Sequence, residues 1–177
     1  MRVLGLDPGS RRTGYGLVEK RGNRLRCGAH GTIVPGARLD LPHRLNDIAA
    51  RAGAVMESER PDVVVIEEAF YHESARSALV LGHVRGALLV AAVQRGLTVA
   101  EYSPREIKMS VTGTGAAAKD QVAFMVRRLL DLRGVLSPDA SDALAAALCH
   151  LQRARLTAPA RAPSAAAQRL EALLFGR

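Results

Sequence analysis

The sequence contains few cysteines and few aromatic residues. Its 177 residues include two cysteines and no tryptophan, and aromatic residues make up 3% of the chain. Cys27 and Cys149 have no further ligands at a spacing typical of a metal site. This composition excludes a disulfide framework and a cysteine-ligated metal centre, and we expect two reduced, buried thiols.

A long hydrophobic run is also missing. The longest apolar stretch, GALLVAAV at residues 86–93, is far shorter than the ~20 residues that a membrane span requires. The opening MRVLGLDPGS has too few apolar residues for a signal peptide. We therefore expect a soluble, cytoplasmic protein that does not associate with a membrane.

Positive charge predominates. The formal net charge is +8 and the sequence pI is about 10.5. No basic amphipathic stretch or lipidation motif is present, so the charge favours nucleic acid over a membrane surface as the acidic partner. Arginine far outnumbers lysine, yet two of the rare lysines, Lys108 and Lys119, fall in one short stretch. A lysine among arginines indicates a need for a compact point charge.

The spacing of apolar residues predicts one α/β domain. The length and the 48% apolar content suit a single core. Strands are predicted over 2–7, 13–20, 24–34, 61–70 and 97–103, and helices over 40–60, 74–95, 104–112, 118–132 and 138–153. Short turns join the first three strands into an antiparallel meander, and the whole forms a mixed five-stranded sheet flanked by helices. We assign residues 1–155 to this domain and residues 156–177 to a Pro/Ala-rich C-terminal tail.

Two aspartates open the last predicted helix. Asp139 and Asp142 are three positions apart, so they share one helix face, where like charges repel. One interpretation is local: Ser137 caps the helix, Pro138 occupies its first position, and the carboxylates meet the positive end of the helix dipole. The other is a divalent cation, which would relieve the repulsion if further carboxylates converge on it.

Other carboxylates lie at the ends of two buried strands. Asp7 ends the first strand at an Asp-Pro-Gly turn, which by itself accounts for an aspartate there. Glu67 and Glu68 end the strand VVVI, and successive strand residues face opposite sides, so only one of them can join Asp7. Gly14 and Gly16 leave space nearby, as where the backbone of a ligand approaches.

Convergence of three such acidic clusters indicates a metal site. In a basic protein, three or four carboxylates typically hold two Mg²⁺ or Mn²⁺ ions about 4 Å apart, which activate water and stabilise the leaving oxygen of a phosphodiester. The alternative is that each carboxylate is simply a solvated end of its element.

Five motifs in register resemble one protein family. GLDPGSRRTGYG, VVIEEAF, LGHVRGAL, SPREIKMSVTGTGAAAKDQV and DASDALAAALCH, spread over residues 1 to 155, are similar to the bacterial RuvC Holliday junction endonucleases. The resemblance implies a ribonuclease-H-like fold and a metal-dependent homodimer that cuts two opposed strands of a four-way DNA junction symmetrically.

The resemblance also implies roles for individual residues. Asp7, Glu67, Asp139 and Asp142 match the four metal-binding carboxylates, which would hold Mg²⁺ or Mn²⁺, two ions per site, and Glu68 stays outside. The implied DNA-contacting residues are Phe70, Arg76, Lys108 and Lys119. Phe70 matches an aromatic wedge, although core packing is its alternative. Lys119, near a helix start, needs a compensating anion, which a phosphate would supply.

The helix near residues 74–95 is expected to join two copies of the chain. Gly82 and Gly86 share one of its faces, which predicts close approach of another backbone, either the sheet below or a second copy. The resemblance favours the second copy, and two symmetric cuts require two symmetric sites. It also implies the branch-migration proteins RuvA and RuvB as partners.

Rival functions remain on the sequence alone. GLDPGSRRTGYGL also resembles the phosphate-binding hairpin of actin-like and sugar-kinase ATPases, although those proteins carry a second related domain. A junction-binding module without catalysis and a ribonuclease-H-like nuclease for another substrate, such as an RNA–DNA hybrid, are further alternatives. An intact carboxylate set argues against the former, and a dimer argues against the latter.

Overall fold

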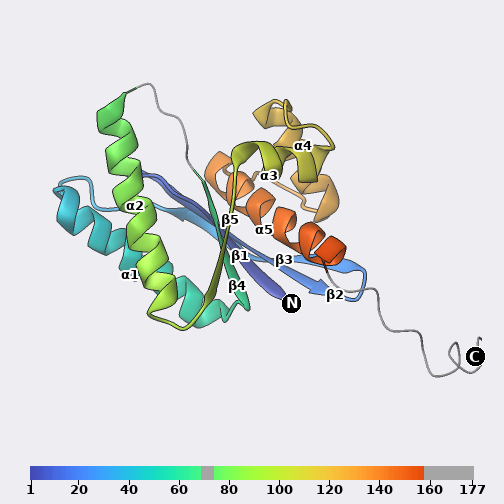
Figure 1. Ribbon diagram of the computed structural model, residues 1–177, viewed down its shortest axis with the longest axis horizontal. Coiled ribbons are helices and arrows are strands. Elements are labelled where there is room, and N and C mark those ends of the chain that lie inside the picture. The colour runs from blue at the N-terminus through green and yellow to red at the C-terminus, as the bar shows by residue number, and fades with distance from the viewer. Residues whose placement is uncertain (69–73, 158–177) are drawn as a thin grey trace, which may run out of the picture.

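A five-stranded sheet forms the centre of the molecule (Figure 1). The structure is a computed structural model, and it describes residues 1–68 and 74–157. The strands are β1 (Arg2–Asp7), β2 (Thr13–Arg21), β3 (Arg24–Ile33), β4 (Val63–Glu67) and β5 (Thr98–Tyr102). Their order is β3-β2-β1-β4-β5, with β1, β2 and β3 antiparallel and β4 parallel to both β1 and β5. The predicted meander and mixed sheet are confirmed.

Helices cover both faces of the sheet. On one side lie α1 (Leu41–Glu59) and α2 (Ala75–Val93), and on the other lie α3 (Pro104–Thr112), α4 (Lys119–Leu129) and α5 (Pro138–Thr157) (Figure 1). Every predicted element is present. Strand β4 begins two residues later than predicted, because its pairing with β1 and β5 begins at Val63. The last two residues of the predicted strand, 69 and 70, lie outside the described residues.

Alternating strand residues divide the interior into two cores. On β1, Val3 packs toward α5 while Leu4 and Leu6 pack toward α1 and α2. Because side chains of successive strand residues point to opposite faces, a continuous apolar strand supplies both cores. The sheet is thus buried on both sides, as the run VVVI in β4 predicts.

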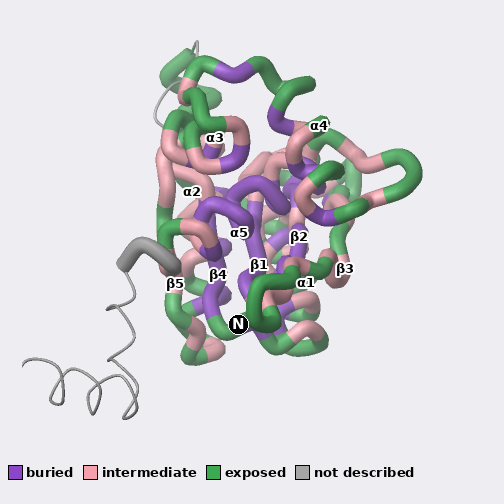
Figure 2. Tube along the Cα trace, turned by 90° about the vertical axis from the view of Figure 1, so that its right-hand side faces the viewer, coloured by how far each residue is buried: buried purple, intermediate pink, exposed green. Residues whose placement is uncertain are grey.

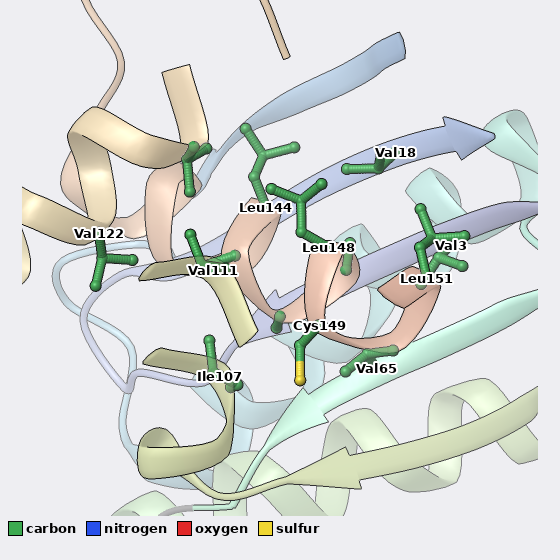
Figure 3. Packing of buried hydrophobic residues seen from close by; sticks show 14 of the residues in the cluster. Val3, Val18, Val65, Ile107, Val111, Val122, Leu144, Leu148, Cys149 and Leu151 are labelled. Carbon is green, nitrogen blue, oxygen red and sulfur yellow. The ribbon is translucent and has the colours of Figure 1, made fainter. Parts of the chain in front are cut away.

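Helix α5 lies unusually close to the sheet. It is largely buried between the sheet and the outer helices α3 and α4 (Figure 2). Its side chains pack among those of β1, β2, β4 and α3 (Figure 3). A Cβ added at Gly5 would lie 1.8 Å from the Ala143 carbonyl oxygen, and one at Gly14 would lie 2.0 Å from that of Asp139. At Gly16 the obstacle is the Leu144 side chain, at 2.5 Å. These glycines admit α5 itself, so the expectation that Gly14 and Gly16 admit a ligand backbone is wrong.

Helix α2 has an uncovered apolar face. Leu79, Val90 and Val93 are 66%, 55% and 65% exposed, and they share this face with Gly82 and Gly86. Apart from the helix's own backbone, no atom of the described residues lies within 4 Å of a Cβ built at either glycine. The sheet below is therefore not what these glycines accommodate.

Judged by length and composition alone, α2 is long and apolar enough to cross a membrane. That test is weak, because core helices also pass it. Here Val84, Leu88, Ala91 and Ala92 of α2 are buried, and α2 packs against α1.

Of the two thiols, Cys149 is buried as expected, whereas Cys27 is only partly buried because it lies on the edge strand β3.

Candidate active site

Two carboxylates meet where parallel strands end. Strands β1 and β4 pair in parallel from Val3 with Val63 to Leu6 with Ile66, so the next residues, Asp7 and Glu67, emerge together at one edge of the sheet. Both are partly buried. Glu67 lines the same cavity as Asp7, whereas Glu68 does not. The prediction that only one of the two glutamates joins Asp7 is confirmed.

The start of α5 brings two further carboxylates to this edge. Helix α5 begins at Pro138, and Ser137 caps it by accepting a hydrogen bond from the Ala140 amide at 3.3 Å. Gly14, which pairs with Asp7 across β1 and β2, leaves room for the backbone of Asp139. Asp139 and Asp142 therefore face Asp7, and both act on its charge.

Burial and the charges of neighbouring carboxylates raise the pKa values of Asp7 and Glu67. Burial, assisted by the charges of Glu67, Asp142 and Asp139, raises the pKa of Asp7 from 3.8 to about 8. Burial and the charge of Asp142 also raise the pKa of Glu67. At these two residues the nearby positive charges do not offset burial and carboxylate repulsion, which is the electrostatic setting of a cation site.

Two lysines place positive charge close to these carboxylates. Lys119 Nζ lies 3.4 Å from Asp142 Oδ2, and this carboxylate is the main cause of a raised pKa at Lys119. The charges of Lys119 and Lys108 oppose the rise in the pKa of Glu67 without cancelling it. The anion that compensates Lys119 at the start of α4 in the free protein is therefore Asp142.

A cavity of about 980 Å³ opens beside the carboxylates. Arg76, at the exposed start of α2, lines it, as does the largely exposed Lys119. The full lining is Asp7, Pro8, Gly9, Ser10, Arg11, Arg44, Glu67, Arg76, Ser77, Val80, Leu81, Pro104 and Lys119. Two of the acidic residues, Asp7 and Glu67, thus line a cavity that also carries several basic side chains, an arrangement suited to a phosphate backbone beside metal ions.

Sequence reasoning missed two residues that touch Asp139. Arg12 Nε donates to Asp139 Oδ2 at 2.7 Å, and the hydroxyl of Thr32 on β3 donates to the same oxygen at 3.1 Å. Arg12 stands three residues after the Asp-Pro-Gly turn, as the second of two adjacent arginines, which was its only signal. Nothing in the sequence connects Thr32 to a helix more than 100 residues later.

The carboxylates have the right chemistry for a hard divalent cation. All the donors are carboxylate oxygens, which Mg²⁺ and Mn²⁺ prefer. Within residues 1–68 and 74–157, no three acidic, histidine or cysteine side chains are close enough to form a ready-made metal site. The carboxylates that surround Asp7 therefore fit such an ion by chemistry and charge, but the described residues do not hold them as a pre-arranged ligand set.

Two further residues do not contribute to this picture. Phe70, the predicted aromatic wedge, lies outside the described residues. Arg85 of α2 forms an ion pair with Glu101 of β5, and its Nε is buried without a hydrogen-bond partner in the described part of the chain.

Comparison with known proteins identifies the family. The family model described as Crossover junction endodeoxyribonuclease RuvC matches residues 3–150. The chain belongs to this family. The protein of Geobacter sp. strain M21 named crossover junction endodeoxyribonuclease RuvC is 47% identical over 158 residues, which cover 89% of this chain and 96% of the relative. The protein of the same name from Bordetella avium is 50% identical over 150 residues, which cover 85% of this chain and 83% of the relative.

Solved structures of the family agree. The Thermus thermophilus RuvC structure is 36% identical, with a TM-score of 0.79, and the same protein in complex with Holliday junction substrate gives 0.83. Each comparison covers 88% of this chain and 96% of the other. The predicted family and ribonuclease-H-like fold class are confirmed, and the ATPase alternative is not supported.

Proposed function

We propose that this chain resolves four-way DNA junctions by hydrolysing one phosphodiester in each of two opposed strands, in DNA recombination and repair. Membership of the crossover junction endodeoxyribonuclease family supports the reaction and the substrate. The observation that carries the assignment to particular residues is the raised pKa of Asp7, which results from burial and from three surrounding carboxylates. Such a cluster is unfavourable unless a cation occupies it.

The metal ligands in this proposal are Asp7, Glu67, Asp139 and Asp142. Their oxygen donors suit Mg²⁺ or Mn²⁺, and four carboxylates are enough for two ions. When bound, such ions lower the pKa of a bound water and stabilise developing charge on the phosphodiester oxygens. The protein itself orients the carboxylates through β1, β4 and α5 and excludes water from the buried side of Asp7.

The basic side chains around the cavity would hold the DNA backbone. Lys119 and Arg76 line the cavity, and Lys108 lies near enough to Glu67 to lower its pKa. In this proposal the phosphates replace Asp142 as the partner of Lys119 once cations neutralise the carboxylates. Phe70 as a wedge between bases stays a prediction, because it lies outside the described residues.

The working unit in this proposal is a homodimer formed through α2. The exposed stripe of Leu79, Val90 and Val93 with two uncovered glycines suits close packing against a second copy. A two-fold axis would then place two sites opposite one another, as paired cuts require. We also infer from the family that RuvA and RuvB are partners and that the protein acts on DNA in the cytoplasm.

Metal-dependent cleavage of a synthetic four-way junction tests the proposal. We expect the wild type to make paired symmetric nicks in the junction and to leave a linear duplex and an RNA–DNA hybrid intact. Asp7→Asn, Glu67→Gln, Asp139→Asn and Asp142→Asn should each abolish cleavage, with junction binding in a gel-shift assay retained.

Glu68→Gln is the matched control, because it makes the same chemical change one residue outside the cavity. It should cleave like the wild type. Equal loss in Glu68→Gln and Glu67→Gln would contradict the assignment of Glu67. Cleavage of the hybrid in place of the junction would contradict the substrate.

A further inference from the structure

The two oxygens of the Asp139 carboxylate have different surroundings. Oδ2 accepts hydrogen bonds from Arg12 Nε at 2.7 Å and from the Thr32 hydroxyl at 3.1 Å. Oδ1 accepts none from the residues that the structure describes. The protein therefore satisfies one oxygen of this carboxylate and leaves the other open to a ligand.

Thr32 is a fixed, neutral donor. Its hydroxyl lies 3.1 Å from that of Ser137, which in turn caps α5 by accepting from the Ala140 amide. With Ser137 donating to Thr32 and Thr32 donating to Asp139, each hydroxyl proton has an acceptor. The contact joins the edge strand β3 to the first turn of α5, and it carries no charge that would oppose a cation.

Arg12 is a charged donor in a more exposed position. Its side chain is 55% exposed, compared with 22% for Asp139. Exposed ion pairs contribute only about 0 to 1 kcal/mol, so this one can be broken easily. A divalent cation on the same carboxylate would repel the guanidinium over a few ångströms. Arg12 and such a cation therefore compete for Asp139.

We propose that Arg12 stands in for a divalent cation at Asp139 in the free protein and that cation binding releases it. Thr32 is a positioning residue that keeps Asp139 oriented in both states. The inference rests on the proposed function, since it requires Asp139 to be a cation ligand. Arg12 and Thr32 contact the same oxygen, yet their removal should change cation affinity in opposite directions.

Calorimetric titration of the full chain with Mn²⁺, without DNA, tests this opposition. Arg12→Ala should bind the ion about three to ten times more tightly, because a competing positive charge is gone. Thr32→Val keeps the shape but loses the hydroxyl, and it should bind several-fold more weakly. Arg11→Ala is the matched control, because it removes an equal charge from the adjacent residue, which lines the cavity but forms no ion pair with a carboxylate in the described part of the chain. Its affinity should rise by clearly less than that of Arg12→Ala.

An Arg12→Ala affinity equal to or weaker than that of the wild type would overturn the proposal, as would an equal gain in Arg11→Ala. Asp139→Asn separates this failure from that of the proposed function. Unchanged Mn²⁺ affinity in a folded Asp139→Asn would remove Asp139 from the ligands altogether. Weakened affinity there, with no gain in Arg12→Ala, would reject only the role of Arg12.

Nuclear magnetic resonance gives a direct measurement of release. The Nε–H signal of Arg12 in ¹⁵N-labelled protein can be assigned by its loss in Arg12→Lys. On titration with Mg²⁺, this signal should move toward the position of a free arginine as the site fills. A signal that stays in place at saturating Mg²⁺ would show that Arg12 remains on Asp139, and would overturn the proposal.

Discussion

Helices α5 and α2 are apolar and similar in length, but their apolar residues serve different purposes. In α5, the residues from Ala143 to Cys149 are all buried inside the chain (Figure 3). In α2, Leu79, Val90 and Val93 point away from the core on a face that nothing in the described chain covers. Glycines lie at both surfaces: in the strands beneath α5, and on the exposed face of α2 itself.

The difference shows how one composition can serve two functions. The small residues under α5 bring its first turn against β1 and β2, which places Asp139 and Asp142 beside Asp7. The proposed role of these carboxylates requires precision there, because catalytic groups tolerate displacements of only a fraction of an ångström. The exposed face of α2 positions nothing within this chain, so its value lies in contact with another molecule.

The largest effect is expected from filling the space under α5. Gly14→Ala would place a Cβ 2.0 Å from the Asp139 carbonyl oxygen. Because the obstacle is backbone, α5 must shift, and we expect a loss of about 3 kcal/mol or more in the free energy of unfolding. Urea denaturation measures this. A loss below 0.5 kcal/mol would show that α5 does not depend on this contact.

A charge on the exposed face of α2 should separate the two copies. Val90→Glu would place a carboxylate in the proposed apolar interface, and we expect the dimer dissociation constant to rise by about 100-fold or more. Sedimentation velocity measures it. The monomer should keep its circular dichroism spectrum, because Val90 is exposed in the single chain. An unchanged dimer would place the interface elsewhere.

The raised pKa of Asp7 makes the stability of the metal-free protein depend on pH. Between its ordinary pKa of 3.8 and about 8, Asp7 keeps a proton only in the folded state, so the free energy of unfolding falls as pH rises through this window. Asp7→Asn cannot titrate. In EDTA it should therefore become more stable than the wild type, by a margin that grows by on the order of 2 kcal/mol from pH 5 to pH 8.

Urea denaturation at several pH values checks this margin, and Mg²⁺ should reduce it by binding the wild type. A margin independent of pH would mean that Asp7 ionises normally in the folded protein.

The smallest effect, with the opposite sign to Gly14→Ala, is expected at Gly86. A Cβ there meets nothing within 4 Å apart from its own helix. Gly86→Ala in the monomeric Val90→Glu background should therefore stabilise the chain by about 1 kcal/mol through helix propensity. In the dimer, the same substitution should weaken association. Destabilisation of the monomer would contradict the open surface at Gly86.

The sequence predicted the elements of the fold better than the contacts between them. Apolar periodicity and turn residues located every strand and helix, because each depends on neighbours in the chain. The carboxylates could be anticipated because strand ends and a helix start are local features. By contrast, the contact of Arg12 and Thr32 with Asp139 depends on how β2, β3 and α5 pack, and no local pattern encodes it. For the same reason, Gly14 could be recognised as a close approach, but α5 could not be identified as its partner.

The contact between Thr32 and Asp139 also connects the proposed active site to the edge of the sheet. Strand β3 has a neighbour on one side only, and edge strands open more readily than central ones. Any cation that steadies Asp139 should therefore slow hydrogen exchange of the β3 amides near Thr32, even though β3 supplies no ligand. Occupancy of the proposed cation site would then be measurable from the exchange rates of a peripheral strand.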